Sequence, residues 1–287
     1  MARVACSPIT WGSTLFETVL DEIADAGYAG TELHDPVVER FDRQRGLLRG
    51  LLEERHLAIA GAHFRGLFFE REEKKPELER LRRLLDFAGE VAGPTIVVFS
   101  TARHPARRDM VAGEPPLLPL TRDRFARLAD ALNQYCDLCA DLGMRGAILN
   151  RVGSYIETPD EYEQVIDLTD PELVWLAPDL GHWAYAGGDP ASLVRIYQER
   201  IIYPRLKDFD RQVFDAVREE RLGFVSFLER GGFRELGQGS LDLETALAPL
   251  VRARYGGWVC VELERTERAP REAAQASREY LRERLHW

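Results

Sequence analysis

Eight short apolar runs alternate with eight longer amphipathic runs along the 287-residue chain. Short apolar runs are typical of buried strands, and the longer runs have the period of helices. Strands that alternate with helices form a parallel sheet, because each parallel connection needs a crossover. The predicted strands cover residues 4–8, 30–33, 57–62, 95–100, 145–149, 173–179, 201–206 and 257–262, and the predicted helices cover 15–27, 39–55, 72–92, 122–142, 158–167, 189–199, 241–254 and 268–284.

Eight strand–helix units in a chain of this length predict an α/β fold, a closed (β/α)8 TIM barrel in a single domain, residues 1–287. An open, doubly wound sheet is disfavoured because no glycine-rich dinucleotide motif follows the first strand. Two connections are long: residues 101–121 after strand 4 and residues 209–240 after strand 7. Both lie on the face where barrel enzymes build their active sites, so we expect them to act as lids.

Composition excludes several classes of function. The formal net charge is −10 and no basic stripe is present, which disfavours binding to nucleic acid. No apolar stretch is long enough for a membrane span, and residues 1–30 lack a signal-peptide pattern. The four cysteines are expected to be reduced, so a cytoplasmic protein is predicted. A homo-oligomer is compatible with the sequence, which does not determine the oligomeric state.

Charged and imidazole side chains gather at the predicted strand ends. Residues two apart on a strand point to the same face, so Arg205 and Lys207 are expected to be neighbours. Two buried cations are costly unless anions face them. The other strand ends supply such anions and imidazoles: Glu32 and His34, His63, Arg151, Asp179 with His182, and Glu262 with Glu264.

Five motifs follow one another between residues 4 and about 266: "GYAGTEL", "PDLGHWAYAGGDP", "RLKD", "ELGQGSLDLETALAPL" and "GWVCVELE". In this order they resemble the xylose-isomerase-like TIM barrels, in particular the sugar phosphate isomerase/epimerase and inosose dehydratase branch. The resemblance implies a divalent metal whose ligands come from four strand ends, and two of these ligand positions fall on Asp179 and Glu262. The other two fall on Leu149 and Arg205, which cannot ligate a metal. We therefore expect no metal, with the Arg205 guanidinium facing the two carboxylates instead.

The resemblance also implies proton abstraction next to a carbonyl. Glu262 is the expected base, with Asp179 as the second choice. His182 is expected to bind a substrate hydroxyl or to relay a proton. Lys207, with the two arginines of the rim, would form a cationic hole for the developing negative charge, or would itself form a Schiff base. The predicted substrate-binding residues are Arg205, Arg151, His63, Glu32, Trp11 and Glu264, although His63 could equally be structural.

Two hypotheses of function follow. The first is an isomerase, epimerase or dehydratase that acts on a small sugar, polyol or keto acid, without the family's metal or with a weakly held one. The alternative is a barrel that binds a small carbohydrate-like ligand and has lost catalysis. A metal-dependent abasic-site endonuclease, a type that shares the superfamily, is disfavoured because the basic DNA-binding face is missing. Three rim cations against the Asp179 and Glu262 carboxylates predict a pocket that prefers an anionic ligand.

Overall fold

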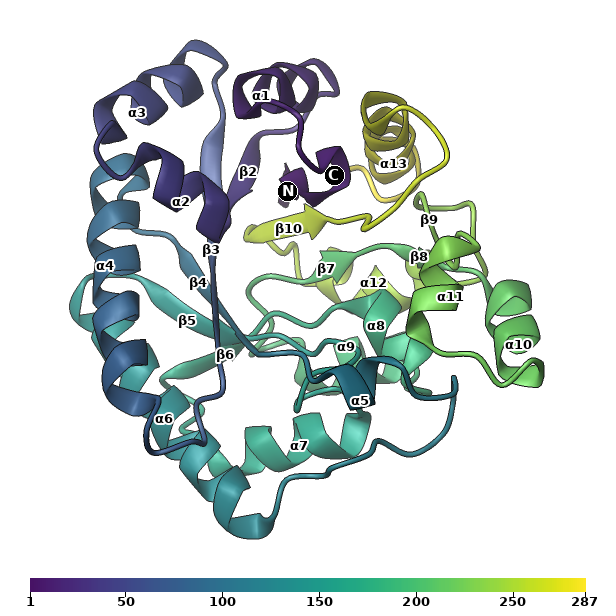
Figure 1. Ribbon diagram of the computed structural model, residues 1–287. Helices are drawn as coiled ribbons and strands as arrows, with labels where there is room; N and C mark the ends of the chain where they lie inside the picture. Colours follow the sequence, from purple (N-terminus) through teal and green to yellow (C-terminus); the bar gives the residue numbers. More distant parts are fainter.

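The structure, a computed structural model that describes residues 1–287, confirms the parallel barrel (Figure 1). Eight strands lie side by side in the order β6-β5-β4-β3-β2-β1-β10-β7. The two ends of this sheet meet through parallel bridges that pair Leu176 with Ile201 and Asp179 with Arg205. The barrel strands are β1 (Arg3–Cys6), β2 (Gly30–Leu33), β3 (Ala58–Gly66), β4 (Ile96–Thr101), β5 (Arg145–Ile148), β6 (Val174–Leu176), β7 (Arg205–Leu206) and β10 (Trp258–Val261).

Helices surround the barrel, and each of the predicted helical regions is present (Figure 1). The region predicted as one helix over 39–55 is two helices, because Gln44 leaves helical geometry with φ −137° and ψ 38°. None of the helices has the length and apolar character needed to cross a bilayer. The helices are η1 (Pro8–Trp11), α1 (Phe16–Asp25), α2 (Asp35–Phe41), α3 (Arg45–Glu54), α4 (Lys74–Ala92), α5 (Pro105–Arg108), α6 (Arg122–Asp141), α7 (Pro159–Leu168), α8 (Leu180–Tyr185), α9 (Pro190–Tyr197), α10 (Arg211–Glu219), α11 (Phe224–Glu229), α12 (Leu243–Arg252) and α13 (Pro270–Arg284).

Both long connections lie where the sequence predicts them, but each contains secondary structure. The connection after β4 contains α5, whose buried Arg107 lies 2.8 Å from both carboxylate oxygens of Glu161 in α7. The connection after β7 contains α10 and α11 between two short antiparallel strands, β8 (Asp208–Phe209) and β9 (Phe233–Arg234). Aromatic side chains pack this second connection into a small core, Phe209, Phe214, Phe224, Phe227 and Phe233. A lid movement of either connection stays a prediction.

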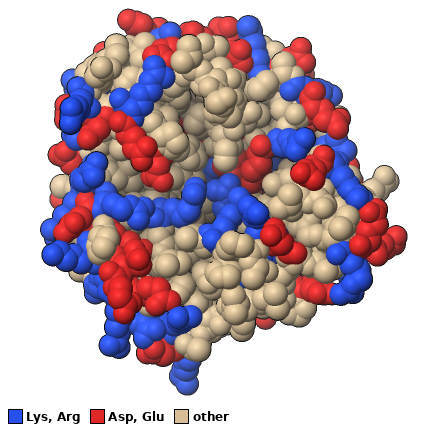
Figure 2. Space-filling model, in the orientation of Figure 1, with Lys and Arg blue, Asp and Glu red and all other residues tan.

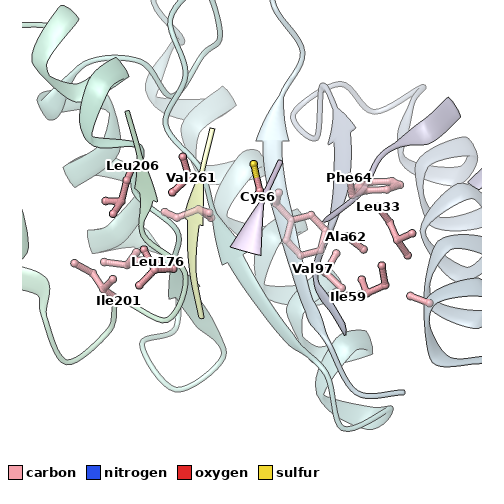
Figure 3. Packing of buried hydrophobic residues seen from close by; sticks show 14 of the residues in the cluster. Cys6, Leu33, Ile59, Ala62, Phe64, Val97, Leu176, Ile201, Leu206 and Val261 are labelled. Carbon is pink, nitrogen blue, oxygen red and sulfur yellow. The ribbon is translucent and has the colours of Figure 1, made fainter. Parts of the chain in front are cut away.

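Alternation along the strands divides the packing into two sides. Residues such as Val97 and Val261 point outward and pack against the helices (Figure 3). Their neighbours Val98 and Cys260 point inward and fill the barrel interior. Because Glu262 follows Cys260 by two residues, it also points inward, above this apolar filling. The strand ends therefore place charged side chains inside the mouth of the barrel.

We predict that Gly146→Ala lowers the stability of the barrel. Gly146 lies in β5 under helix α6, and a Cβ there would overlap the Cys136 sulfur and lie 2.9 Å from the Phe99 ring. Overpacking of this kind costs about 1–3 kcal/mol, which a lower unfolding midpoint in thermal or urea denaturation would reveal. Gly50→Ala is the matched control, since nothing lies within 4 Å of its Cβ. This second change should stabilise helix α3 by about 0.5–1 kcal/mol. Equal midpoints for the two variants would contradict the packing described here.

Candidate active site

A layer of charged side chains fills the mouth of the barrel, directly above its apolar interior. They come from the ends of β2, β5, β6, β7 and β10 and are almost completely buried. We call this group the ion cluster: Glu32, Arg151, Asp179, Arg205, Lys207, Glu262 and Glu264.

Arg205 is the centre of the ion cluster. Its guanidinium donates one hydrogen bond to Glu262 and two to Glu32, of which the second, from Nη2 to Oε2, is 3.2 Å long. Its Nε lies 3.9 Å from Oδ2 of Asp179. The contacts expected from the sequence, with Asp179 and Glu262, are therefore present. The additional bidentate contact with Glu32 crosses the barrel, because β1 and β10 separate β2 from β7.

Lys207 completes the pairing of the acids. Its Nζ lies 3.0 Å from Asp179, 2.8 Å from Glu262 and 2.8 Å from Glu264. Arg151 approaches the same acids more loosely, with Nη2 3.8 Å from Glu262 and 3.6 Å from Glu264. Arg205 and Lys207 are thus each paired with several carboxylates, which is the condition for burying a cation.

The pairing keeps the cluster ionised. Burial alone would raise the pKa of Glu262, but the charges of Arg205 and Lys207 hold it well below its usual value. Glu32 behaves alike, because Arg205 and His63 outweigh its burial and lower its pKa. Burial alone would lower the pKa of Lys207, but the neighbouring carboxylates outweigh it and raise the pKa above its usual value. A Schiff base on Lys207, which needs a neutral amine, is therefore disfavoured, and Glu262 is a weaker base than the sequence suggests.

Two histidines border the ion cluster on the side of β2 and β3. The rings of His34 and His63 stack with centroids 4.3 Å apart. Nε2 of His63 lies 3.0 Å from Glu32 and 2.9 Å from Arg205, and burial lowers the pKa of His63 to about 3. Nε2 of His34 lies 3.5 Å from Glu32 and 3.4 Å from the Ser7 hydroxyl. Burial thus keeps the His63 imidazole neutral near pH 7.

A cavity of about 600 Å³ opens beside these histidines. His34, His63 and Arg65 line it, together with residues of η1 and helix α2. A cavity of this size accommodates a small polyhydroxylated ligand. The sequence places His34 at the same strand end as Glu32 but assigns it no role; the exposed edge of its ring on this cavity is a tertiary feature.

The polar atoms of His182 and Trp11 make hydrogen bonds to other residues of the protein. His182 lies in the first turn of helix α8, where its backbone N–H donates to Oδ1 of the N-cap residue Asp179 at 3.0 Å. Its ring is buried, which lowers its pKa, and its Nε2 lies 2.8 Å from Glu264. The indole N–H of Trp11 donates to Glu22 at 2.6 Å, and Trp11 does not line the cavity. The expected substrate contact of Trp11 is therefore not supported, because its polar atom is used within the fold.

The charge count of the rim also differs from the sequence-based one. The sequence-based count sets only Asp179 and Glu262 against the cations, whereas Glu32 and Glu264 are also buried inside the ion cluster. Four carboxylates thus face three cations, Arg151, Arg205 and Lys207. The inner layer carries an excess of one negative charge, so the excess cation inferred from the sequence is not found there.

Two groups of side chains have the composition and spacing of a metal site. One consists of Asp179, His182 and Glu262, and the other of Glu32, His34 and His63. Within each group the potential ligand atoms lie within 4.8 Å of one another. Carboxylate and imidazole donors together suit divalent ions such as Zn²⁺ and Mn²⁺.

Comparisons with known proteins match nearly the whole chain. The family model described as xylose isomerase-like TIM barrel matches residues 20–284. An inosose dehydratase from Geobacillus kaustophilus is 29% identical, covering 99% of this chain and 95% of the relative. The inosose dehydratase of Clostridium beijerinckii is 30% identical, with 94% and 89% covered. A crystal structure of the IOLI protein with a bound zinc atom shares the fold, with TM-score 0.75, 17% identity, and 99% and 98% of the two chains covered.

The expectation of a barrel without a metal is wrong. A zinc atom is bound by the similar IOLI protein, and this chain brings together two groups of ligand side chains. The sequence argument considered only the four positions implied by the resemblance, of which Leu149 and Arg205 cannot ligate. It did not consider His182 as a metal ligand. The first turn of helix α8 brings His182 to Asp179 and Glu262.

We predict that Arg205→Met destabilises the protein by about 3–5 kcal/mol at pH 7, because it leaves Glu32 and Glu262 buried without their main counter-charge. In the native chain these acids have lowered pKa values, so they add stability above about pH 4.3 that is lost as the pH falls through their folded values. In the variant the sign reverses, and acidification from about pH 7 to about pH 5 should recover stability as the acids take up protons.

Unfolding midpoints at the two pH values measure this difference. Arg282→Met removes an exposed pair with Glu279 and is the control, with a cost below about 1 kcal/mol at either pH. A variant of Arg205 that is as stable as this control would show that the central pairing is dispensable.

Proposed function

This chain belongs to the xylose isomerase-like TIM barrel family, and we propose that it is a sugar-modifying enzyme that removes a proton next to the carbonyl of a cyclic keto-polyol and eliminates water. Isomerisation or epimerisation would begin with the same proton abstraction. The substrate class is taken from the inosose dehydratases, which match almost end to end. A cytoplasmic location and a homo-oligomeric state stay predictions.

The observation that carries the proposal is the cavity beside His34 and His63, at the carboxyl ends of the barrel strands. Barrel enzymes bind their substrates at this end. The cavity borders an ionised cluster whose charges are fixed before any substrate binds. Such preorganised charges stabilise an enolate without reorganisation.

We assign the base to His34 rather than to Glu262. His34 faces the cavity, whereas both oxygens of Glu262 accept hydrogen bonds from Arg205 and Lys207. Imidazole is the commonest general base in enzymes. The ionised Glu32 carboxylate, 3.5 Å from Nε2 of His34, would stabilise the imidazolium that forms. In the reaction the α C–H bond and the β C–O bond break, a C=C bond forms, and the proton and hydroxyl leave as water.

Asp179, His182 and Glu262 are the residues that would hold a divalent metal. Oδ2 of Asp179 is buried and accepts no hydrogen bond, and its nearest cationic atom is Nζ of Lys207 at 3.0 Å. Both carboxylates also contact the Lys207 ammonium, which would have to share them. When bound, the metal would polarise a substrate carbonyl. Glu32 and the two cavity histidines belong to the other side of the cluster, and Arg205 lies between the two groups.

The proposed function is tested by incubating the protein with 2-keto-myo-inositol and related keto-polyols, with and without added Mn²⁺. Loss of one water, followed by mass spectrometry and by the absorbance of the conjugated product, is the expected result. Isomerised or epimerised products would keep the proton-abstraction step and change only its outcome. Binding of these compounds without any turnover would instead support the non-catalytic barrel.

We predict that His34→Asn lowers kcat by about 10²–10⁴-fold while the protein stays folded. The reason is loss of the proposed proton acceptor from the cavity wall. His56→Asn is a matched control, because His56 is exposed and has φ 53°, a conformation that asparagine also tolerates. Steady-state kinetics measures kcat for both variants, and circular dichroism checks that both are folded. Unchanged kcat in His34→Asn would remove this residue from the mechanism.

We also predict that Mn²⁺ or Zn²⁺ raises the thermal midpoint of the protein through binding linkage. Asp179→Asn should abolish the shift, and it retains the side-chain oxygen that caps helix α8. His34→Asn should keep the shift, since His34 belongs to the other ligand group. A shift lost only in His34→Asn would move the metal to the Glu32 side, and no shift in the native chain would rule out both groups.

A further inference from the structure

Three arginines stand at the ends of neighbouring strands: Arg65 and Arg103, which have no role in the proposed chemistry, and Arg151, the most loosely paired cation of the ion cluster. Arg65 lies near the end of β3, Arg103 two residues after β4, and Arg151 three residues after β5. These strands are adjacent in the sheet, and β3 pairs with β4 so that Arg65 lies opposite Ser100. Since their carboxyl ends meet at one edge of the barrel mouth, the three side chains start from one side of the mouth, where Arg65 lines the cavity.

Their orientation follows from the strands. Arg65 comes two residues after His63 on β3, so it points to the same, inner side and lies further out toward solvent. Both residues line the cavity of about 600 Å³. Lys and Arg side chains gather in the middle of this face of the molecule (Figure 2). Arg65 therefore presents its guanidinium where a ligand in the cavity would lie above the ion cluster.

The three guanidiniums have hydrogen-bond donors left over. Arg103 donates from Nε to the Val152 carbonyl at 3.1 Å, while its buried Nη2 has no partner. Nε of Arg151 is also buried without a partner, and its Nη2 comes no closer than 3.6 Å to a carboxylate. Arg65 and Arg103 take part in none of the ion pairs of the structure. Buried donors without acceptors are uncommon and costly in proteins.

The three charges also act on one another. Burial and the nearby Arg151 charge lower the pKa of Arg103 to about 10. The same two causes lower the pKa of Arg65. Like charges at neighbouring strand ends repel one another, and an anion bound between them would offset that repulsion. Arg65 and Arg103 add two cations beside an inner cluster with one excess negative charge, and the acids that act on Arg65 are Asp35, on the cavity wall, and Glu262.

We propose that Arg65, Arg103 and Arg151 form an oxyanion subsite that binds a carboxylate or phosphate group of the substrate at the β3–β5 side of the cavity. The inference rests on the proposed function for the rest of the substrate, a polyhydroxylated carbon chain or ring. Guanidinium groups match the planar or tetrahedral oxygens of such groups through paired hydrogen bonds. A substrate acid would relieve the repulsion among the three charges, and a rotation of the Arg103 and Arg151 side chains would expose their buried free donors to it.

The test is a binding comparison of matched acid and neutral compounds by isothermal titration calorimetry. D-gluconate is compared with D-glucitol, and D-glucose 6-phosphate with D-glucose. Each acid should bind at least about tenfold more tightly than its neutral partner, the minimum expected for charge-assisted hydrogen bonds. Whichever acid binds more tightly identifies the group as carboxylate or phosphate. Inorganic phosphate should compete with both acids, because the acidic group and not the sugar occupies the arginines.

Two variants locate the subsite. Arg103→Gln and Arg65→Gln should each reduce the preference for the acid by about tenfold. Arg65 is more exposed than Arg103, which is half-buried, so the Arg65 variant keeps the test valid if Arg103 proves necessary for folding. The matched control is Arg49→Gln, because Arg49 is an exposed arginine in the middle of helix α3. This variant should keep the full preference for the acid over the neutral compound.

Equal binding of acid and neutral compounds, no binding of either acid, or an acid preference that survives in both variants would each overturn the subsite. These outcomes are separate from failure of the proposed function. Dehydration of a neutral keto-polyol without any acid preference would leave the function and remove the subsite. An acid preference that depends on Arg65 and Arg103, in a protein with no turnover, would do the reverse.

Discussion

The Arg205 guanidinium between the carboxylates of Glu32 and Glu262 is the interaction on which the mouth of this barrel depends. The three side chains come from β7, β2 and β10 and are fully buried. The arginine needs both acids and each acid needs the arginine, because an unpaired charge in this interior would cost several kcal/mol. The contact with Glu262 joins the neighbouring strands β7 and β10, and the contact with Glu32 connects β7 to β2, which is not its neighbour in the sheet. Lys207 and His63 take their positions from the same acids.

This pairing also gives different roles to the groups inside the ion cluster and the groups at its edge. Groups inside the ion cluster have their charges fixed by one another and are poorly placed to exchange protons. Groups at its edge, such as His34 and Arg65, keep atoms that face the cavity. Electrostatic preorganisation requires charges that are already fixed where the substrate binds, and the ion cluster forms such a layer. The chemistry therefore belongs to the boundary between cluster and cavity, with the cluster providing the field.

Much of the architecture and the membership of the site follow from the sequence. Strict alternation of strands and helices predicts the barrel, and barrel topology brings all strand ends to one face, which is why Glu262 and Arg205 could be paired from sequence. Arg65 was missed because the third strand was expected to end at residue 62, whereas β3 continues to Gly66. The continued alternation of His63 and Arg65 was the available signal. Arg103 carries no comparable signal, because it lies in an irregular connection.

The sequence by itself determined the order of elements and the types of side chain at the strand ends, because periodicity and spacing along the chain encode both. Only the tertiary structure decided which charges are paired, since that depends on separations of a few ångströms across the barrel. It buried Glu32 and Glu264 and so reversed the charge balance expected for the inner layer. It also brought His182 to Asp179 and opened the cavity beside His34. Strand stagger and side-chain rotamers set these distances, and neither is encoded in a local pattern.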